Sequence, residues 1–198
     1  MKFSVILPLH NAEQFCRVML ESIRSQTFTD YELICVCDSC DDRTAEIARE
    51  YTDRVAEVSF GRAGLSRNMG LEMAQGEWVL FADDDDWLPD DGVYQWFADN
   101  VGKHGEDILF CAFDWIGIGL KKQSPDCRFC AVWNKAWRRE FIGGTRFSDR
   151  PYGDDADFDE WMMAKKPVTW YEDRCVYVYN YMRKGSLTDQ WKRGDIHG

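Results

Sequence analysis

Short apolar runs alternate with segments of helical periodicity in the first half of the chain, and this alternation constrains the fold most. Four runs are predicted to be buried strands: 3–7, 33–37, 56–59 and 78–81. Three segments between them are predicted to be helices: 12–25, 44–51 and 65–74. Such alternation builds parallel sheets with right-handed crossovers, so we predict an α/β domain with a mostly parallel central sheet flanked by helices.

Residues at the ends of these elements predict where the first strand stops and where the first helix begins. Pro8 should end the first strand, and Asn11 should cap the helix that follows, with Val18 on its buried face. The second half is less regular. We expect helices at 90–100 and 155–164, the second with Trp161 inward, strands at 108–112, 170–171 and 176–181, and a small irregular C-terminal part.

Composition favours a single globular domain over residues 1–198. Hydrophobic residues make up 45% of the chain, which is ample for a core, and the net charge of −11 argues against a nucleic-acid partner. We find no run of about 18 apolar residues, so we expect no transmembrane segment. Met1-Lys2-Phe3 leads into a strand-like segment rather than a signal peptide, so we expect a cytoplasmic protein, with a peripheral position on the inner face of the membrane as a further option.

Eight cysteines in such a chain indicate reduced thiols rather than a disulfide framework. Cysteines 35, 37, 40, 127 and 130 are a less favoured zinc-ligand set, because Cys35 and Cys37 lie in a predicted strand, where small buried thiols are ordinary core residues.

Four carboxylates, Asp83 to Asp86, follow directly on the strand at 78–81. Ligands of parallel α/β sheets bind beyond the carboxyl ends of the strands, where Asp38 also lies. A hard divalent cation would offset the repulsion within the run, with Asp83 and Asp85 facing it and Asp84 facing elsewhere. The alternative is a solvated acidic turn in which Asp86 caps a helix starting near Pro89.

Two other ligand-binding classes do not fit. An EF-hand loop beginning at Asp83 would need Gly and Glu where Leu88 and Tyr94 stand, and the sequence has no P-loop motif.

Several motifs, in order, resemble family 2 glycosyltransferases of the GT-A fold. They span about the first 160 residues, and their order and spacing carry the resemblance. The matching segments are Val5-Ile6-Leu7-Pro8-Leu9-His10-Asn11, Ser22 to Phe28, Cys37-Asp38-Ser39-Cys40-Asp41-Asp42-Arg43-Thr44, Gly64 to Leu71, Phe81-Ala82-Asp83-Asp84-Asp85-Asp86-Trp87, Val132 to Lys135 and Tyr152-Gly153-Asp154-Asp155.

The resemblance implies a metal-dependent, inverting transfer of a sugar from a nucleotide-sugar donor to a hydroxyl acceptor such as a glycan, and a UDP-linked donor is the first expectation. Residues 1–100 would bind the donor and residues 101–198 the acceptor. It implies that Asp38 and Arg67 hydrogen-bond the base, in a pocket that Pro8 and His10 line. Asp83 and Asp84 would approach the ribose or metal, and Asp85 would hold Mg²⁺ or Mn²⁺. Asp155 would be the catalytic base. We expect Asp154 to cap the helix that carries Asp155, and the field of that helix N-terminus to keep Asp155 ionised at neutral pH.

The chain departs from the family pattern at three of these positions. Cys37 replaces a usual Asp, His10 replaces Tyr and Asp154 replaces Glu. Trp133 is either an acceptor platform or core, and 183–186 is either a segment that closes over the diphosphate or a solvated basic loop. Alternative functions are a non-catalytic nucleotide-sugar-binding relative and a nucleotidyltransferase of similar fold.

Overall fold

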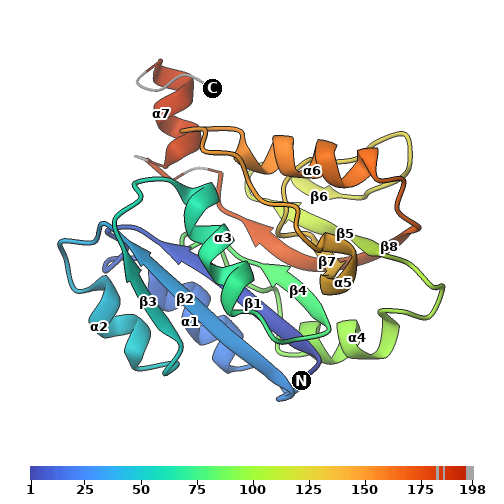
Figure 1. The fold of residues 1–198 in the computed structure, drawn as a ribbon, viewed down its shortest axis with the longest axis horizontal. Helices are drawn as coiled ribbons and strands as arrows, with labels where there is room; N and C mark the ends of the chain where they lie inside the picture. The colour runs from blue at the N-terminus through green and yellow to red at the C-terminus, as the bar shows by residue number, and fades with distance from the viewer. Residues whose placement is uncertain (182, 185, 195–198) are drawn as a thin grey trace.

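A single mixed sheet forms the centre of the computed structural model, which describes residues 1–181, 183–184 and 186–194 (Figure 1). Its strand order is β3-β2-β1-β4-β7-β5-β6, and β8 pairs with β5. The strands are β1 Phe3–Leu9, β2 Tyr31–Asp38, β3 Val55–Val58, β4 Trp78–Phe81, β5 Ile108–Trp115, β6 Gly119–Lys121, β7 Lys135–Arg138 and β8 Thr169–Tyr179. The helices are α1 Cys16–Arg24, α2 Thr44–Arg49, α3 Ala63–Met73, α4 Val93–Asn100, α5 Arg139–Ile142, α6 Asp154–Ala164 and α7 Leu187–Arg193.

The predicted parallel sheet is confirmed for the first half of the chain. Strands β3, β2, β1 and β4 are all parallel, as βα alternation requires. In the second half β7 runs antiparallel to both β4 and β5, so the complete sheet is mixed. Strand β7 was not predicted, because its four residues carry no alternating pattern of their own.

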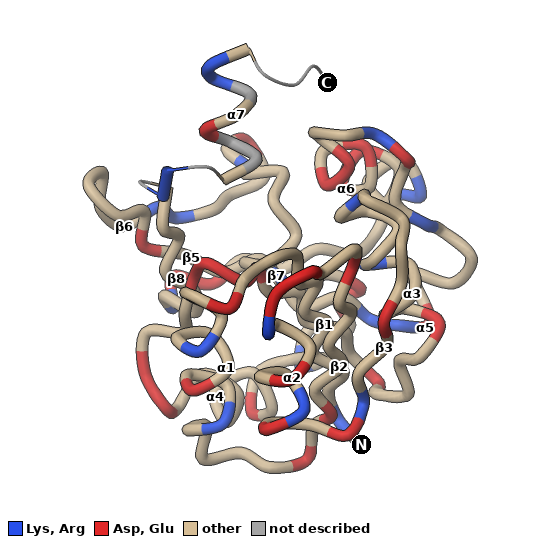
Figure 2. Tube along the Cα trace, turned by 90° about the vertical axis from the view of Figure 1, so that its left-hand side faces the viewer, with Lys and Arg blue, Asp and Glu red and all other residues tan. Residues whose placement is uncertain are grey.

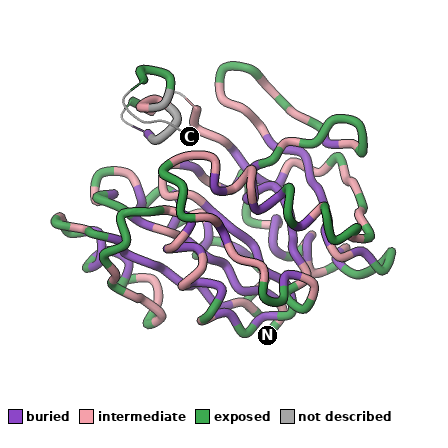
Figure 3. Tube along the Cα trace, turned by 45° about the horizontal axis from the view of Figure 1, so that its top comes forward, coloured by how far each residue is buried: buried purple, intermediate pink, exposed green. Residues whose placement is uncertain are grey.

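Helices cover both faces of the sheet and bury a separate apolar layer on each. One layer contains buried side chains of α1, α2 and α4, and the other contains those of α3, α5 and α6. The strands between the two layers are buried along most of their length, whereas the loops and outer helix faces are exposed (Figure 3). A strand covered on both faces reads as a continuous apolar run, which is why β1, β2 and β4 were visible in the sequence.

Gly70 allows α3 to lie directly on β1. A Cβ atom at this position would overlap the Ile6 side chain of β1. This close approach brings the N-terminal end of α3, with Arg67, to the carboxyl end of the parallel strands.

Two predictions about the first strand and helix were wrong. Strand β1 continues through Pro8 to Leu9, which is possible because its neighbour β4 already ends opposite Ile6 and requires no further donor. Asn11 does not cap a helix. It has a left-handed φ of 46° and its side chain accepts a hydrogen bond from Asp41 N, and α1 starts at Cys16.

Two side chains predicted to face inward are exposed, Val18 by 55% and Trp161 by 43%. Periodicity located both helices, but the buried stripe is narrower than the apolar pattern suggests. The two late strands predicted at 170–171 and 176–181 form one continuous strand, β8. No helix in the described part of the chain is long and apolar enough to cross a membrane.

Candidate active site

A cavity of about 680 Å³ opens at the carboxyl ends of β1, β2 and β4, between the N-termini of α3 and α6. Every residue that the sequence analysis assigned to the site lines it. These residues are Pro8, His10, Asp38, Arg67, Asp83, Asp84, Asp85 and Asp155. The β1, β2 and β4 residues gather there because parallel strands end at the same edge of the sheet, as sequence reasoning anticipated.

Asp38, at the end of β2, accepts five hydrogen bonds from the chain itself. Its Oδ1 accepts from the N–H groups of Phe60 (2.7 Å) and Gly61 (2.8 Å), and from Ser39 Oγ. Its Oδ2 accepts from Arg62 N–H (3.0 Å) and from Ser66 Oγ (2.9 Å). Burial alone would raise the pKa of Asp38, but these hydrogen bonds outweigh it and lower the pKa.

A carboxylate offers about four acceptor positions, so the chain already uses those of Asp38. Within this structure the carboxylate therefore fixes residues 60–62, which lead into α3 and of which Gly61 and Arg62 line the cavity. Hydrogen bonding to a nucleotide base remains a prediction, and it would require one of these donors to be displaced.

His10 stands exposed at the mouth of the cavity and is oriented by the backbone of β2. Its Nδ1 lies 2.7 Å from the carbonyl oxygen of Asp38. A carbonyl oxygen only accepts hydrogen bonds, so Nδ1 carries a proton and Nε2 faces away from this contact. The flat ring is thus held in one orientation, as stacking on a base would require.

Arg67 joins the acidic turn after β4 to the start of α6. Its Nη1 donates to Asp154 Oδ2 (2.6 Å) and its Nη2 donates to Asp83 Oδ1 (2.8 Å), and its side chain is only 7% exposed. Gly64 permits this approach, since a Cβ atom there would lie 2.6 Å from the Ser148 carbonyl and 3.1 Å from Asp154 Cβ. Both terminal nitrogens are therefore engaged within the chain.

The acidic run forms a turn rather than an extended segment, so Asp83, Asp84 and Asp85 all line the cavity. The prediction that Asp84 faces elsewhere was wrong, because side chains alternate only on extended backbone. The alternative role of Asp86 as a helix cap was also wrong. Asp86 is fully buried and accepts from Asn180 N (2.7 Å), and α4 starts only at Val93.

Burial raises the pKa of Asp84 and of Asp85, and the neighbouring carboxylates of the run add to the effect. Elsewhere acidic and basic residues are interspersed along the chain (Figure 2), whereas this turn concentrates negative charge in one hollow. Carboxylate oxygens are the ligands that Mg²⁺ and Mn²⁺ prefer, so the donor chemistry fits the implied metal.

No group of three or more His, Cys, Asp or Glu side chains able to hold a metal ion is present among residues 1–181, 183–184 and 186–194. Zinc ligation by the cysteines therefore finds no support in that part of the chain. Mg²⁺ commonly takes one or two protein carboxylates and completes its shell with phosphate oxygens and water. The acidic turn fits that mode of binding.

Arg183 reaches the acidic turn from the segment after β8. Its Nε pairs with Asp85 Oδ2, and its guanidinium lies 4.3 Å from the centre of the Phe15 ring. Ser186 also lines the cavity, Lys184 is exposed, and Gly185 lies outside the described residues. Arg183 is thus a cavity residue, and whether it would meet a diphosphate stays a prediction.

Asp155 lies in the first turn of α6, at the opposite wall of the cavity. The helix cap is Gly153, in a left-handed conformation with φ 86°, so the expected cap Asp154 is instead the first helical residue and pairs with Arg67. Burial raises the pKa of Asp155 to about 6, although Arg67 lowers it. A pKa of about 6 still leaves Asp155 mostly ionised at pH 7, as expected, but the pKa is raised rather than lowered because burial outweighs the field of the helix N-terminus.

Sequence reasoning missed a buried ion pair that supports this wall. Lys135 is fully buried, and its Nζ lies 3.0 Å from Asp159 Oδ1 and donates to the carbonyls of Phe129 and Ala131. Asp159 lies one turn after Asp155 on α6, so the ion pair ties that helix to β7, and the carbonyl contacts of Lys135 add the loop before β7. The segment 132–135 was singled out, but no sequence signal identifies a partner 24 positions away.

Trp133 belongs to the core and also borders the cavity, and its role as an acceptor platform stays a prediction. Its ring is 6% exposed and stacks on Tyr177 with centroids 4.5 Å apart, yet it also lines the cavity. A role for Tyr177 at the site was not predicted. Its hydroxyl accepts a hydrogen bond from Asp83 N (2.9 Å), so β8 holds the acidic turn in place.

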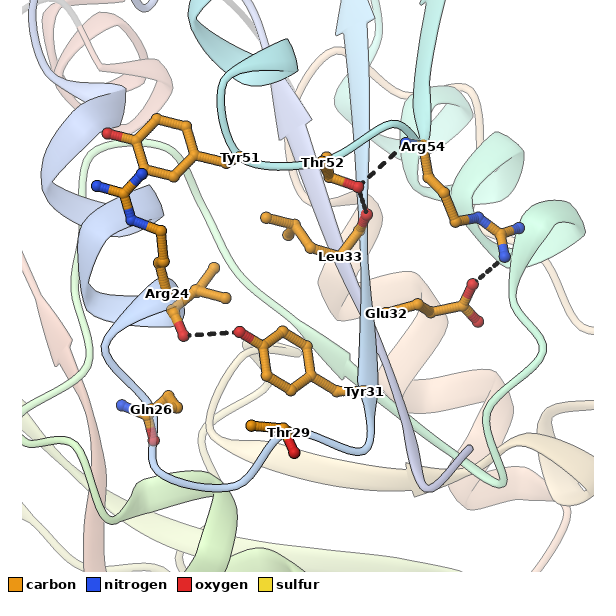
Figure 4. A pocket seen from close by; sticks show the side chains of 10 residues that line it. Arg24, Gln26, Thr29, Tyr31, Glu32, Leu33, Tyr51, Thr52 and Arg54 are labelled. Carbon is orange, nitrogen blue, oxygen red and sulfur yellow. Dashed lines mark hydrogen bonds and ion pairs between the residues drawn. The ribbon is translucent and has the colours of Figure 1, made fainter.

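A smaller hollow of about 340 Å³ lies at the amino end of β2 (Figure 4). Its polar side chains already have partners. Arg54 pairs with Glu32, Thr52 donates to the Leu33 carbonyl (2.8 Å), and Tyr31 donates to the Ile23 carbonyl (3.0 Å). Its lining lacks the cluster of carboxylates that marks the larger cavity.

Residues 4–171 match the model of glycosyl transferase family 2. The chain belongs to this family. Among curated proteins it is 26% identical to Glycosyltransferase GlyA of Streptococcus pneumoniae, over 99% of this chain and 33% of that protein. It is 38% identical to the putative glycosyltransferase EpsH of Bacillus subtilis, over 73% of this chain and 49% of that protein. The family 2 chain thus spans less than half the length of both relatives.

Solved structures share the fold. TarS 1-349 of Staphylococcus aureus, in complex with UDP-GlcNAc, superposes with a TM-score of 0.83 at 24% identity, over 95% of this chain and 60% of that chain. Mannosyltransferase PcManGT of Pyrobaculum calidifontis, in complex with GDP-Man and Mn²⁺, gives a TM-score of 0.73 at 16% identity, over 93% of this chain and 58% of that chain. These likenesses confirm the predicted GT-A architecture of the family 2 chain.

Proposed function

We propose that this chain is the catalytic domain of a metal-dependent, inverting glycosyltransferase that uses a nucleotide-sugar donor. The observation that carries the proposal is that eight residues, chosen for their roles in the family, line one cavity at the carboxyl end of the parallel strands. The cavity also has carboxylates on two separate elements, Asp83 to Asp85 on the turn after β4 and Asp155 on α6. Sugar transfer needs two such groups, one to hold the metal and one to accept the proton of the acceptor.

The donor would lie over the parallel half, residues 1–100. His10 would stack on the base, and the loop that Asp38 fixes would border it. A UDP-linked sugar is the first choice, since the similar TarS structure was solved with UDP-GlcNAc. The PcManGT structure with GDP-Man makes guanine the main competitor.

Asp85, with Asp83 beside it, would hold Mg²⁺ or Mn²⁺ against the diphosphate. When bound, such an ion offsets the negative charge that grows on the departing nucleoside diphosphate. Arg67 fixes the orientation of Asp83 from the protein side. Arg183 would supply a second positive charge next to the leaving group, because it already lies at Asp85.

Asp155 would take the proton of the acceptor hydroxyl as it attacks the anomeric carbon. A pKa of about 6 leaves the carboxylate mostly ionised at pH 7 to 8 and makes it a better base than an exposed aspartate. The acceptor would enter from the half formed by residues 101–198, opposite the diphosphate. Attack from that side inverts the anomeric configuration.

The decisive experiment measures transfer and donor binding on the same purified variant. UDP-sugars and GDP-mannose are first screened by thermal shift with Mn²⁺ and with EDTA, because a ligand that binds the native state raises Tm by mass action. Asp155→Asn should then keep metal-dependent donor binding and lose roughly 10²-fold or more in transfer rate.

Asp157→Asn is the matched control, since Asp157 lies on the same helix but pairs with Arg150 (2.7 Å) and Ser148 (2.6 Å) outside the cavity. It should transfer at nearly the wild-type rate. Normal transfer by Asp155→Asn would exclude it as the base, and donor binding without transfer by the wild-type chain would identify a non-catalytic relative.

A further inference from the structure

Cys37 and Cys40 form a Cys-x-x-Cys pair at the end of β2, on either side of the segment that begins with the cavity residue Asp38. The chain turns sharply between them, because Ser39 adopts a left-handed φ of 53°. This turn folds Cys40 back onto the apolar layer that contains Cys37. As a result Cys40 Sγ lies 3.5 Å from the carbonyl oxygen of Leu9, the β1 residue that pairs with Cys37 in the sheet.

The two thiols differ in the way that a reactive pair requires. Cys37 is 1% exposed, whereas Cys40 is partly exposed. Interaction with the neighbouring Cys37 thiol is the main cause that lowers the pKa of Cys40, to about 7. A partly exposed cysteine with a stabilised thiolate is the attacking thiol, and its buried neighbour is the resolving one.

The turn between them also carries the donor pocket. Cys40 Sγ lies 3.5 Å from the carbonyl oxygen of Leu9 and 3.8 Å from that of Asp38. The Asp38 carbonyl is the same atom that orients His10, and the Asp38 carboxylate holds residues 60–62. Oxidation of Cys40 would therefore affect the proposed base site on two sides, at His10 and at residues 60–62.

We propose that Cys37 and Cys40 are a redox-active dithiol whose disulfide weakens nucleotide binding. The thiol chemistry stands by itself, and its effect on the nucleotide rests on the proposed function. The oxidant class is a low-molecular-weight disulfide such as glutathione disulfide.

The reaction has two thiol–disulfide exchanges. The Cys40 thiolate attacks one sulfur of glutathione disulfide, an S–S bond forms, and one glutathione thiolate leaves. Cys37 then loses its proton to solvent and its sulfur attacks Cys40 Sγ, which expels the second glutathione. Two electrons pass from the dithiol to the glutathione disulfide, and two molecules of reduced glutathione result.

Closing the disulfide draws the two sulfurs to about 2.05 Å. It also replaces the contacts of Cys40 Sγ with the Leu9 and Asp38 carbonyls and tightens the turn that carries Asp38. We expect the affinity for UDP in the presence of Mn²⁺ to fall roughly 3- to 10-fold, the equivalent of one hydrogen bond.

The experiment incubates the purified chain with glutathione disulfide, alkylates free thiols under denaturing conditions, and maps tryptic peptides by mass spectrometry. The peptide 25–43 contains Cys35, Cys37 and Cys40 and should lose two hydrogens while Cys35 is alkylated. Cys40→Ser should abolish this product, and Cys35→Ala, the matched control, should retain it. Alkylation of both Cys37 and Cys40 after the incubation, or a disulfide through Cys35, would overturn the proposal.

Calorimetry with UDP and Mn²⁺ then compares the reduced, oxidised and re-reduced chain. Equal affinity of the oxidised and reduced forms would refute the coupling to the nucleotide. If the reduced chain bound no nucleotide, the proposed function would fail while the disulfide result stood.

Discussion

Replacing Asp38 with alanine removes the acceptor that organises residues 60–62. Three backbone N–H groups, those of Phe60, Gly61 and Arg62, would lose their partner, whereas the hydroxyls of Ser39 and Ser66 can rotate to other acceptors. A buried donor left without a partner costs about 1–3 kcal/mol. Because water from the cavity can satisfy part of this demand, we expect a total loss of about 3–5 kcal/mol in the free energy of unfolding.

Urea denaturation followed by circular dichroism measures this loss, and a thermal scan should show Tm lower by roughly 6–20 °C. Asp53→Ala, at an exposed position before β3, is the matched control and should change stability by less than about 0.5 kcal/mol. Hydrogen bonds lower the pKa of Asp38 in the folded chain. Its stabilisation is therefore complete above the unfolded pKa and is lost as the pH falls through the lower folded value, so the variant and wild type should converge in acid.

The outcome separates two roles of this carboxylate. If Asp38→Ala unfolds within about 1 kcal/mol of wild type but binds UDP more weakly by about 1–3 kcal/mol, the carboxylate serves the base and not the loop. That result would refute the reasoning from the five internal hydrogen bonds.

Three further predictions concern the other walls of the cavity. Asp85→Ala should abolish the difference in UDP affinity between Mn²⁺ and EDTA, measured by calorimetry, while the exposed control Asp149→Ala keeps it; equal affinities in wild type would contradict the metal site. The transfer rate should rise with pH and reach half its maximum near pH 6, because the pKa of Asp155 is about 6 and only its ionised form accepts the proton; a flat profile from pH 5 to 8 would contradict this assignment. Lys135→Met should cost about 3–5 kcal/mol in urea denaturation because it strands the buried Asp159 carboxylate, and adding Asp159→Leu should recover part of that loss.

The order of the elements in the first half was determined by the sequence alone. Strands β1, β2 and β4 are covered on both faces, so they read as uninterrupted apolar runs, and the helices between them show 3.6-residue periodicity. Parallel topology then placed Asp38 and the acidic turn at one edge. Because of this topology, and because family motifs pointed to Arg67 and Asp155, the residues that line the cavity could be predicted from the sequence.

What the cavity residues contact was decided by tertiary structure. The partners of Arg67, Asp85 and Lys135 lie 87, 98 and 24 positions away, and no local pattern encodes contacts at such separations. The same holds for Asp155, whose position at a helix N-terminus suggested a low pKa. Burial between α6 and the loop before β7 raises it instead, because desolvation depends on every element that packs around the carboxylate and not on the helix that carries it.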